Sequence, residues 1–222
     1  MLIAAILISA IISYLIGSLN SALTVVRLWK HEDIREHGSK NAGLTNALRV
    51  YGKGVALVTL LTDLTKGVAA VLLSKLAFSL LLPDIQPTEL YCVGYLASFF
   101  AVLGHIFPLY FGFKGGKGIL IAATTLLVTD PIVFCIVIPM FAILVATTKY
   151  VSLSSIITAS AYPVVTFAVE FLRDFPIKTV CIDTGLVVCI CFFLIFMHRP
   201  NIARLKAGTE NKFSFKSKGE GK

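Results

Sequence analysis

The chain has 222 residues, of which 57% are hydrophobic and 14% are charged, and its formal net charge is +8. A soluble domain of this length carries about 25% charged residues, so the composition argues against a water-soluble globular protein and indicates that lipid covers much of the surface. The five cysteines all fall inside apolar runs and give no sign of a disulfide framework. In a membrane protein, positive charge is typical of a basic cytoplasmic face, so no nucleic-acid partner is expected.

Several apolar segments reach or approach the roughly 20 residues needed to cross a membrane. No positive residue precedes the first segment, so we expect a transmembrane helix there and not a cleaved signal peptide. The stretch 115–148 is too long for one helix, and Asp130-Pro131 interrupts it, because proline disfavours helical backbone in the residue before it. Dividing the stretch there predicts seven transmembrane helices, at about 2–26, 54–82, 89–111, 115–129, 131–148, 151–172 and 178–197.

The positive charges decide whether the short segment 115–129 crosses the membrane or is re-entrant. With seven crossings and the N-terminus outside, the inside segments include 27–53, with six Lys and Arg residues, and 198–222, with seven. The segments expected outside carry only Arg173. If 115–148 crossed only once, the two most basic segments would lie on opposite sides of the membrane, which contradicts the positive-inside rule.

The predicted fold class is therefore an all-α membrane protein with seven transmembrane helices, the N-terminus outside and the C-terminus in the cytoplasm. We expect one integral membrane domain over residues 1–212. The polar, basic residues 213–222 are expected to form a mobile cytoplasmic tail. Their charge would suit anionic lipid, but the sequence does not decide whether the tail binds it.

Residues 31–54, which follow the first apolar segment, combine glycines with short hydroxyl and amide side chains. Glycines let the backbone turn so that several N–H groups converge, and the side chains add further donors. Nearby basic residues supply the positive charge that a phosphate needs. The segment predicts an anion site, with an ordinary polar turn as the alternative. The candidate ligands are Ser39, Asn41, Gly43, Thr45, Asn46 and Arg49.

A second cluster is the sequence FKGGKG at residues 113–118, which precedes a short predicted helix. Lysines and the N–H groups of a helix N-terminus suit a phosphate. The segment is not a Walker A loop, because Phe111 and Gly118 stand where that motif needs Gly and Ser or Thr. His105 is either a core histidine or a phosphate donor. The candidates here are His105, Lys114, Gly115, Gly116 and Lys117.

A third cluster directly follows the last apolar segment and contains His198, Arg199, Asn201 and Arg204. A positive-inside signal accounts for the arginines, but it leaves the histidine and the asparagine unexplained. Three basic, donor-rich loops on one face suggest a substrate with two phosphates, or two phosphorylated substrates. No acidic cluster has the form of a metal site, so we expect no metal.

Asp63 and Lys66 form a charged pair inside the second apolar segment. They are three residues apart and therefore share a helix face. A charged residue at the centre of a membrane helix costs at least about 2.5–3.5 kcal/mol, so we expect the pair to face the bundle interior, with Lys66 reaching toward the cytoplasmic site.

These motifs resemble the PlsY family of bacterial acyl-phosphate:glycerol-3-phosphate acyltransferases over nearly the whole chain. The first motif is matched by Asp33, Arg35, Gly38, Ser39, Asn41, Gly43, Thr45 and Asn46, with Arg49, Asp63 and Lys66 following. The second is matched by Gly104, His105, Pro108 and residues 113–118, and the third by His198, Arg199, Asn201, Arg204, Gly208, Thr209 and Glu210. Lys149–Leu153, which includes Ser152, is similar to the family's entry to the sixth helix. The chain departs from the family where Leu120 and Ile121 replace a small residue and a threonine.

The resemblance implies that an acyl chain passes from acyl phosphate to the 1-hydroxyl of glycerol 3-phosphate, giving lysophosphatidic acid and phosphate. It implies no metal, CoA or other cofactor, and a location in the bacterial inner membrane with the active site facing the cytoplasm; no obligate protein partner is evident. We expect Ser39, Lys117, His198 and Asn201 to carry catalysis by positioning and charge stabilisation, with Ser152 and Arg199 added to the phosphate-binding residues.

Two other functions compete with this interpretation. A transporter of a phosphorylated metabolite would suit a basic cavity among seven helices, but transporters bind near the bilayer midplane, whereas these motifs gather on one face. A CDP-alcohol phosphotransferase would need a carboxylate-rich metal motif, which the sequence lacks.

Overall fold

The computed structural model describes residues 1–213, and every regular element within them is a helix, as the sequence predicts. Six helical segments are long and apolar enough to cross a membrane. They are α1 (Leu2–Ser18) continued by α2 (Ser21–Lys30), α3 (Leu44–Leu81), α4 (Glu89–Ile106), α6 (Pro131–Thr148), α7 (Val151–Leu172) and α8 (Ile177–Met197). The shorter elements are α5 (Ile119–Thr129), α9 (Arg199–Lys206) and the 3-10 turns η1 (Ile34–Glu36) and η2 (Leu109–Phe111). All but the first residue of the predicted mobile tail, 213–222, lies outside the described residues.

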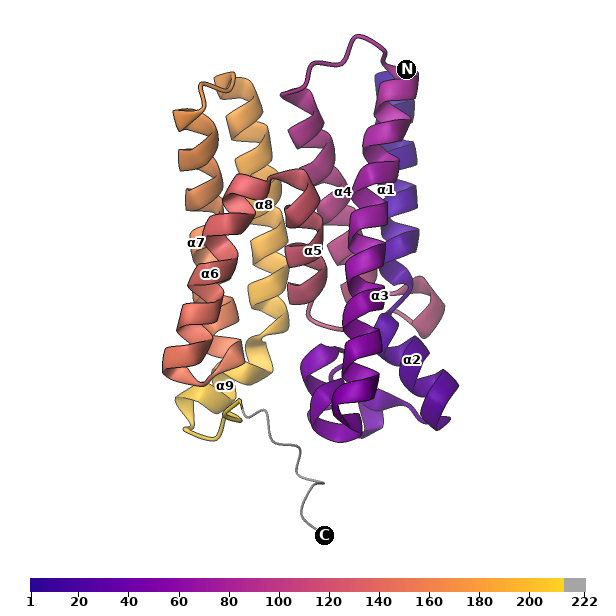
Figure 1. The fold of residues 1–222 in the computed structure, drawn as a ribbon, viewed down its shortest axis with the longest axis vertical. Helices are drawn as coiled ribbons and strands as arrows, with labels where there is room; N and C mark the ends of the chain where they lie inside the picture. Colours follow the sequence, from indigo (N-terminus) through magenta and orange to yellow (C-terminus); the bar gives the residue numbers. More distant parts are fainter. Residues whose placement is uncertain (214–222) are drawn as a thin grey trace.

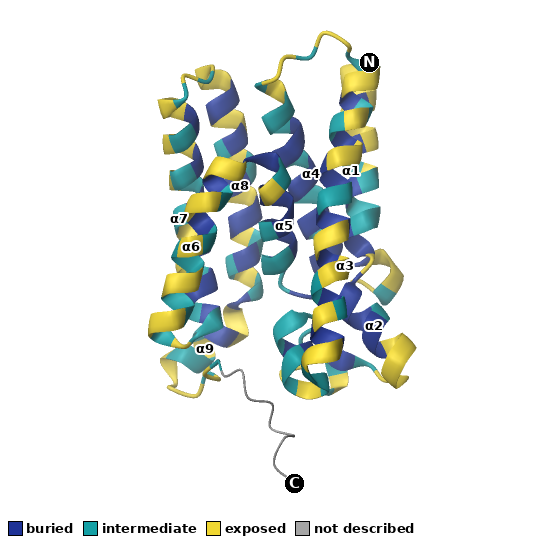
Figure 2. Cartoon of the chain, in the orientation of Figure 1, coloured by how far each residue is buried: buried dark blue, intermediate teal, exposed yellow. Residues whose placement is uncertain are grey.

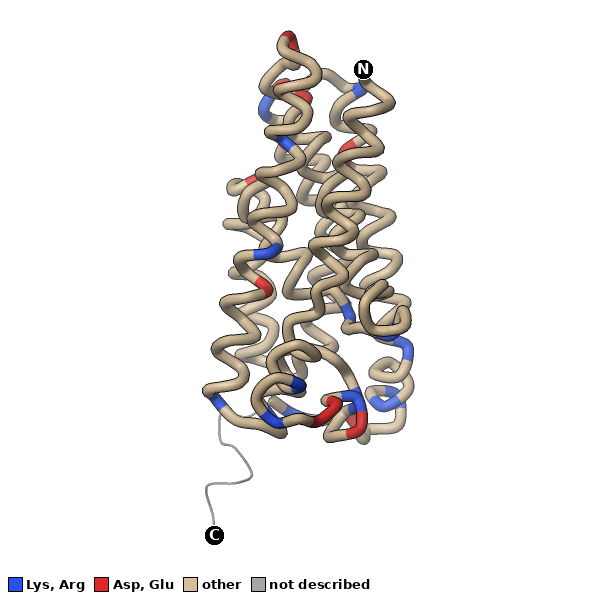
Figure 3. Tube along the Cα trace, turned by 90° about the vertical axis from the view of Figure 1, so that its right-hand side faces the viewer, with Lys and Arg blue, Asp and Glu red and all other residues tan. Residues whose placement is uncertain are grey.

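The long helices lie side by side, and the chain reverses at two ends of the bundle (Figure 1). The N-terminus and the connections α3–α4 and α7–α8 lie at the upper end, while α9 and the α2–α3 loop lie at the lower end. Most Lys and Arg positions also lie at the lower end (Figure 3). The N-terminus and α9 are therefore at opposite ends, which is the arrangement that the positive-inside argument requires.

Helix α5 is shorter than the sequence predicts. It begins at Ile119 and not at residue 115, because Gly118 has a φ of 86° and ends the preceding loop. Its 11 residues extend about 16 Å at 1.5 Å per residue, whereas a hydrocarbon core is about 30 Å thick. The turn from α5 to α6 lies well below the upper end of the bundle (Figure 1). The count of seven full crossings stays a prediction, since α5 alone cannot span the core.

Polar side chains satisfy the backbone where α5 ends inside the bundle. Asp130 caps α6 by accepting the amide hydrogens of Ile132 and Val133, at 3.0 and 3.2 Å. Arg173 Nη1 in turn lies 3.1 Å from Asp130 Oδ2. Lys75 Nζ donates to the carbonyl oxygen of Val128, at 3.1 Å. Because lipid offers no hydrogen bonds, a helix end at this depth needs such partners.

Helices α1 and α4 approach closely through glycines. A Cβ atom on Gly17 would collide with the backbone of Ala101, and one on Gly104 would collide with the carbonyl oxygen of Tyr14. Small residues at helix contacts are the usual device for packing in membranes. Many other large apolar side chains are exposed along the bundle, at positions that face the surrounding medium (Figure 2).

Helix α3 is divided by Gly52, whose backbone angles (φ 81°, ψ −171°) are not helical. The residues after the kink form the long membrane segment that the sequence predicts from residue 54. The residues before it, 44–51, turn aside at the lower end and pack with α2 and Ile34 in a small core of their own. This kink places Thr45 and Arg49 beside the other basic loops.

Candidate active site

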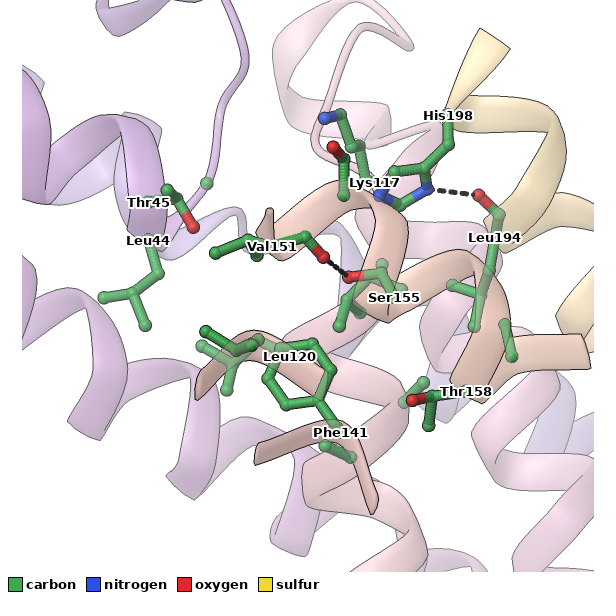
Figure 4. Close-up of a pocket in the computed structure, with 18 of the residues that line it drawn as sticks. Leu44, Thr45, Lys117, Leu120, Phe141, Val151, Ser155, Thr158, Leu194 and His198 are labelled. Atoms are coloured by element: carbon green, nitrogen blue, oxygen red, sulfur yellow. Dashed lines mark hydrogen bonds between the residues drawn. The ribbon is translucent and has the colours of Figure 1, made fainter. Parts of the chain in front are cut away.

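A cavity of about 910 Å³ lies between the lower loops and helices α5, α6 and α7. Its polar end includes Ser39, Asn41, Gly43, Thr45, Asn46, Arg49, His105, Lys117, Ser152, His198, Asn201, Arg204 and Glu210. The remainder is mostly apolar and includes Leu120, Leu127, Phe134, Val137, Phe141 and Val145. Lys117 and His198 lie together in Figure 4, with Leu120 and Phe141 farther along the cavity. The cavity therefore joins a cationic, donor-rich mouth to an apolar channel.

All four residues expected to carry catalysis line this one cavity: Ser39, Lys117, His198 and Asn201. They come from three segments far apart in the sequence, as predicted from the topology. Five of the other predicted ligands do not line it: Lys66, Lys114, Gly115, Gly116 and Arg199. The polar mouth is built from the lower loops and not from the middle of the bundle, unlike the midplane site of a transporter.

Asn46 organises the first loop. Its Oδ1 accepts the backbone N–H of Ser39 at 2.9 Å, and its Nδ2 donates to the carbonyl oxygens of His37 and Ile34 at 3.0 and 3.3 Å. Gly38, with a φ of 59°, lets the chain turn tightly around this amide. Asn46 thus uses its amide to shape the loop that presents Ser39, whereas the sequence suggested a direct phosphate ligand.

Arg35 joins the first loop to the second. Its guanidinium binds the Asp33 carboxylate, with Nη2 to Oδ2 at 2.6 Å, and its Nη1 donates to the carbonyl oxygens of Phe111 and Lys114 at 3.0 and 3.1 Å. The hydrogen bond from Arg35 is the main cause that holds the pKa of Asp33 well below its usual range. This arginine therefore fixes the relative position of two motifs and does not supply charge to the cavity.

The glycine-rich segment packs against the end of α4. The N–H groups of Gly115 and Gly116 donate to the carbonyl oxygens of Ile106 and His105, at 3.0 and 3.2 Å. A Cβ atom on Gly115 would collide with the His105 carbonyl, and one on Gly116 with His105 Nε2. The expectation that these two amides cradle a phosphate is therefore wrong. Their glycines are needed for close packing, which depends on a tertiary contact that sequence spacing does not reveal.

The two lysines of this segment differ in environment. Lys114 is exposed at the surface and lies outside the cavity. Lys117 lines the cavity, and burial lowers its pKa to about 8, with the neighbouring guanidinium groups of Arg204 and Arg49 acting in the same direction and Glu210 opposing them. Lys117 is thus the lysine placed to bind an anion in the cavity, and it stays largely charged at pH 7.

His198 ends α8 and is 3% exposed. Its Nδ1 lies 2.7 Å from the carbonyl oxygen of Leu194 (Figure 4), so Nδ1 carries the hydrogen. Burial lowers the pKa of His198 to about 4, so the ring is neutral at pH 7. Nε2 is then a hydrogen-bond acceptor.

Short helix α9 brings Asn201 and Arg204 to the same cavity wall. Both bind Glu210, with Asn201 Nδ2 at 2.9 Å from Oε1 and Arg204 Nε at 2.8 Å from Oε2. The Oδ1 atom of Asn201 is buried and has no hydrogen-bond partner among the described residues. The hydroxyl of Ser152 is also buried, and it too has no hydrogen-bond partner within residues 1–213. Both oxygens are thus available to a bound substrate.

Arg204 and Glu210 were not among the predicted ligands, although they line the cavity. The spacing carried a signal: residues 198, 201 and 204 are three apart, and such positions share a helix face. Arg199 is turned away and stacks on the Phe196 ring, with its guanidinium carbon 3.8 Å from the ring centroid. The positive-inside rule is enough to explain why an arginine occurs at position 199.

Comparison with known proteins gives one consistent family. A sequence profile described as glycerol-3-phosphate acyltransferase matches residues 7–208. The glycerol-3-phosphate acyltransferase of Streptococcus thermophilus is 36% identical over 214 residues, covering 95% of this chain and 94% of the relative. That of Bacillus cytotoxicus is 40% identical over 208 residues, covering 94% and 95%.

Solved structures agree with the sequence relatives. The crystal structure of PlsY, an integral membrane glycerol 3-phosphate acyltransferase, in its glycerol 3-phosphate form has a TM-score of 0.77 at 30% identity, covering 94% of this chain and 96% of that chain. Its lysophosphatidic acid form has a TM-score of 0.73 at 28% identity, covering 95% and 96%.

The apolar helical bundle is that of an integral membrane enzyme, and a basic cavity lies at one end of its helices. The chain belongs to the PlsY family of glycerol-3-phosphate acyltransferases, and the predicted family is confirmed.

Proposed function

We propose that the enzyme transfers an acyl chain from acyl phosphate to the 1-hydroxyl of glycerol 3-phosphate, at the cytoplasmic face of a bacterial inner membrane. The hydroxyl oxygen forms an ester bond with the acyl carbon, the bond from that carbon to the phosphate oxygen breaks, and the hydroxyl proton leaves with the phosphate. The products are lysophosphatidic acid and inorganic phosphate. One solved relative is described in a lysophosphatidic acid form, which supports this product.

The observation that carries the proposal is the continuity of the cavity. Arg49, Lys117 and Arg204 bring positive charge to one end, and apolar side chains of α5, α6 and α7 line the rest. An acyl phosphate is divided in a matching way, because its compact dianion would fit the cationic end and its long apolar chain would fit the apolar remainder. Acyl-CoA would add an adenine and a 3′-phosphate, which need a further polar pocket. Among the described residues, the loops at this end are short and already packed on one another.

The polar groups suggest a division of roles. Lys117 lines the cavity, and its charge suits the departing phosphate. The neutral His198 offers Nε2 as an acceptor, and Asn201 offers Oδ1, so both suit the hydroxyl of the glycerol substrate. Ser39 and Arg49 lie in the first loop, where they suit its phosphate. Catalysis then rests on positioning and charge stabilisation, without a metal or cofactor.

The test is a turnover assay of purified protein with palmitoyl phosphate and labelled glycerol 3-phosphate. We expect lysophosphatidic acid to form, palmitoyl-CoA to support little or no turnover, and inorganic phosphate to inhibit competitively against the donor. Lys117→Met, purified in parallel, should lose activity and so exclude a contaminating enzyme. Arg199→Gln is the matched control, because Arg199 lies outside the cavity. Equal rates with palmitoyl-CoA would refute acyl phosphate as the preferred donor.

A further inference from the structure

Lys66 is buried in α3, yet it does not line the cavity. Its Nζ lies 2.7 Å from Asp63 Oδ1, 2.9 Å from the carbonyl oxygen of Leu19 and 3.2 Å from His105 Nδ1. An ammonium has three hydrogens and no acceptor. The three neighbours therefore use all of its donors, and Lys66 has none left for a substrate.

The position of Lys66 determines which nitrogen of His105 carries the hydrogen. Because the ammonium can only donate, His105 Nδ1 must accept. A protonated imidazole would direct a second N–H at the ammonium, so the ring is neutral and its hydrogen is on Nε2. Ser21 Oγ donates to Asp63 Oδ1 at 2.7 Å, which holds the carboxylate that pairs with Lys66.

His105 Nε2 has no hydrogen-bond partner in residues 1–213, and the ring belongs to the cavity wall. Gly116 allows this approach, because a Cβ atom there would collide with Nε2. The next residue after Gly116 is Lys117, which lines the same wall. His105 Nε2 therefore lies against the residue that precedes Lys117, and the side chains of His105 and Lys117 border the same cavity.

We propose that Lys66 is a positioning residue that fixes His105 in its Nε2–H form, so that this N–H donates to a phosphate oxygen bound beside Lys117. Lys66 acts on the substrate only through His105. The two histidines of the cavity are then opposite tautomers. His105 carries its hydrogen on Nε2, which donates, whereas His198 carries its hydrogen on Nδ1, bound to the Leu194 carbonyl, so its Nε2 accepts. The inference rests on the proposed phosphate substrate, but the form of the ring can be measured without turnover.

The first measurement is ¹⁵N NMR of protein labelled at histidine, in detergent micelles or nanodiscs. His105→Gln identifies the signals of His105 by their loss. We expect the Nε2–H form in the wild type and a shift toward the Nδ1–H form in Lys66→Met. Since Lys66→Met leaves the Asp63 carboxylate buried without its cation, the double variant Asp63→Asn/Lys66→Met serves if the single variant fails to fold. A wild-type His105 in the Nδ1–H form overturns the proposal.

The second measurement is the dissociation constant of inorganic phosphate, taken in the same samples. Losing one hydrogen bond to a charged group weakens binding about tenfold or more, so His105→Leu and the Lys66 variant should each show this loss. The two losses should not add when combined, because both remove the same N–H. His105→Gln, which keeps a donor amide, should recover part of the affinity.

Unchanged phosphate affinity in His105→Leu also overturns the proposal, and additive losses would show that Lys66 acts by another route. The outcomes separate this inference from the proposed function. If the NMR and phosphate results are as expected but acyl phosphate gives no turnover, only the proposed reaction fails.

Discussion

His198 Nδ1 lies 2.7 Å from the carbonyl oxygen of Leu194, one turn earlier in α8. This bond fixes the hydrogen on Nδ1. Burial of the ring lowers the pKa of His198 to about 4, although the bond to Leu194 acts in the opposite direction, and the pKa of a free histidine is about 6.5. Between these two values the unfolded chain binds a proton that the folded protein excludes. Acid therefore favours the unfolded state over this range.

We predict that stability falls as the pH is lowered from about 6.5 toward 4. His198→Gln should lose less stability over the same range, because it removes the group whose protonation differs between the folded and unfolded states. The measurement is the midpoint of thermal unfolding of both proteins between pH 7 and 4.5. Arg199→Gln, one residue away, should keep the wild-type slope. Equal slopes for His198→Gln and the wild type would contradict this account of the ring.

Gly116 is predicted to tolerate no side chain. A Cβ atom there would lie 2.6 Å from the carbonyl oxygen of Ala42 and would also meet His105 Nε2, so both the loop and the ring must move. Gly116→Ala should lower activity at least about tenfold, since a displaced phosphate donor costs that much or more. Gly54→Ala is the control, because nothing lies within 4 Å of its Cβ position in α3. A fully active Gly116→Ala would show that the approach of His105 to this loop is unnecessary.

Local chemistry made much of the fold predictable. The break at Asp130-Pro131 was predictable because proline acts on its immediate neighbours. The structure has a helix boundary there, and it adds that Asp130 caps α6. The start of α5 was harder to predict from the sequence. Because Gly118 has a positive φ, the helix begins at Ile119, four residues after the predicted start at residue 115. The Asp63–Lys66 pair was correctly placed on one buried face, since helical spacing alone decides it.

The site was predictable at the level of which segments meet, and less so at the level of individual atoms. Charge distribution along the chain placed three basic loops on one side, and they do share a cavity. Which of Lys114 and Lys117 enters the cavity depends on how residues 113–118 pack against α4. The hydrogen positions on His105 and His198 depend on Lys66 and on Leu194, and no spacing rule reveals them.

The orientation in the membrane gives a prediction about accessibility. In a variant without the native cysteines, Asp84→Cys in the α3–α4 connection should react with an impermeant thiol reagent in intact cells. Lys206→Cys in α9 should react only after the cells are permeabilised, because an odd number of crossings separates the two positions if α5 and α6 each count as one. Labelling of both positions from outside would mean that 115–148 crosses only once.

Lys117 should set the alkaline limit of the reaction. Burial lowers its pKa to about 8, with Arg204 and Arg49 contributing, so the free enzyme loses this charge as the pH rises through that value. We predict that kcat/KM with acyl phosphate falls above about pH 8, approaching tenfold per pH unit, since kcat/KM reports the ionisation of the free enzyme.

Lys117→Arg tests the cause of that fall. An arginine stays charged to above about pH 12, so this variant should keep a flat profile above pH 8 even if its maximal rate is lower than that of the wild type. Lys114→Arg is the matched control, since Lys114 lies three residues away but outside the cavity, and it should keep the wild-type fall. Steady-state kinetics from pH 6 to 10 would measure all three proteins. If Lys117→Arg declined at the same pH as the wild type, the titrating group would be another residue, and the proposed role of Lys117 at the departing phosphate would lose its main support.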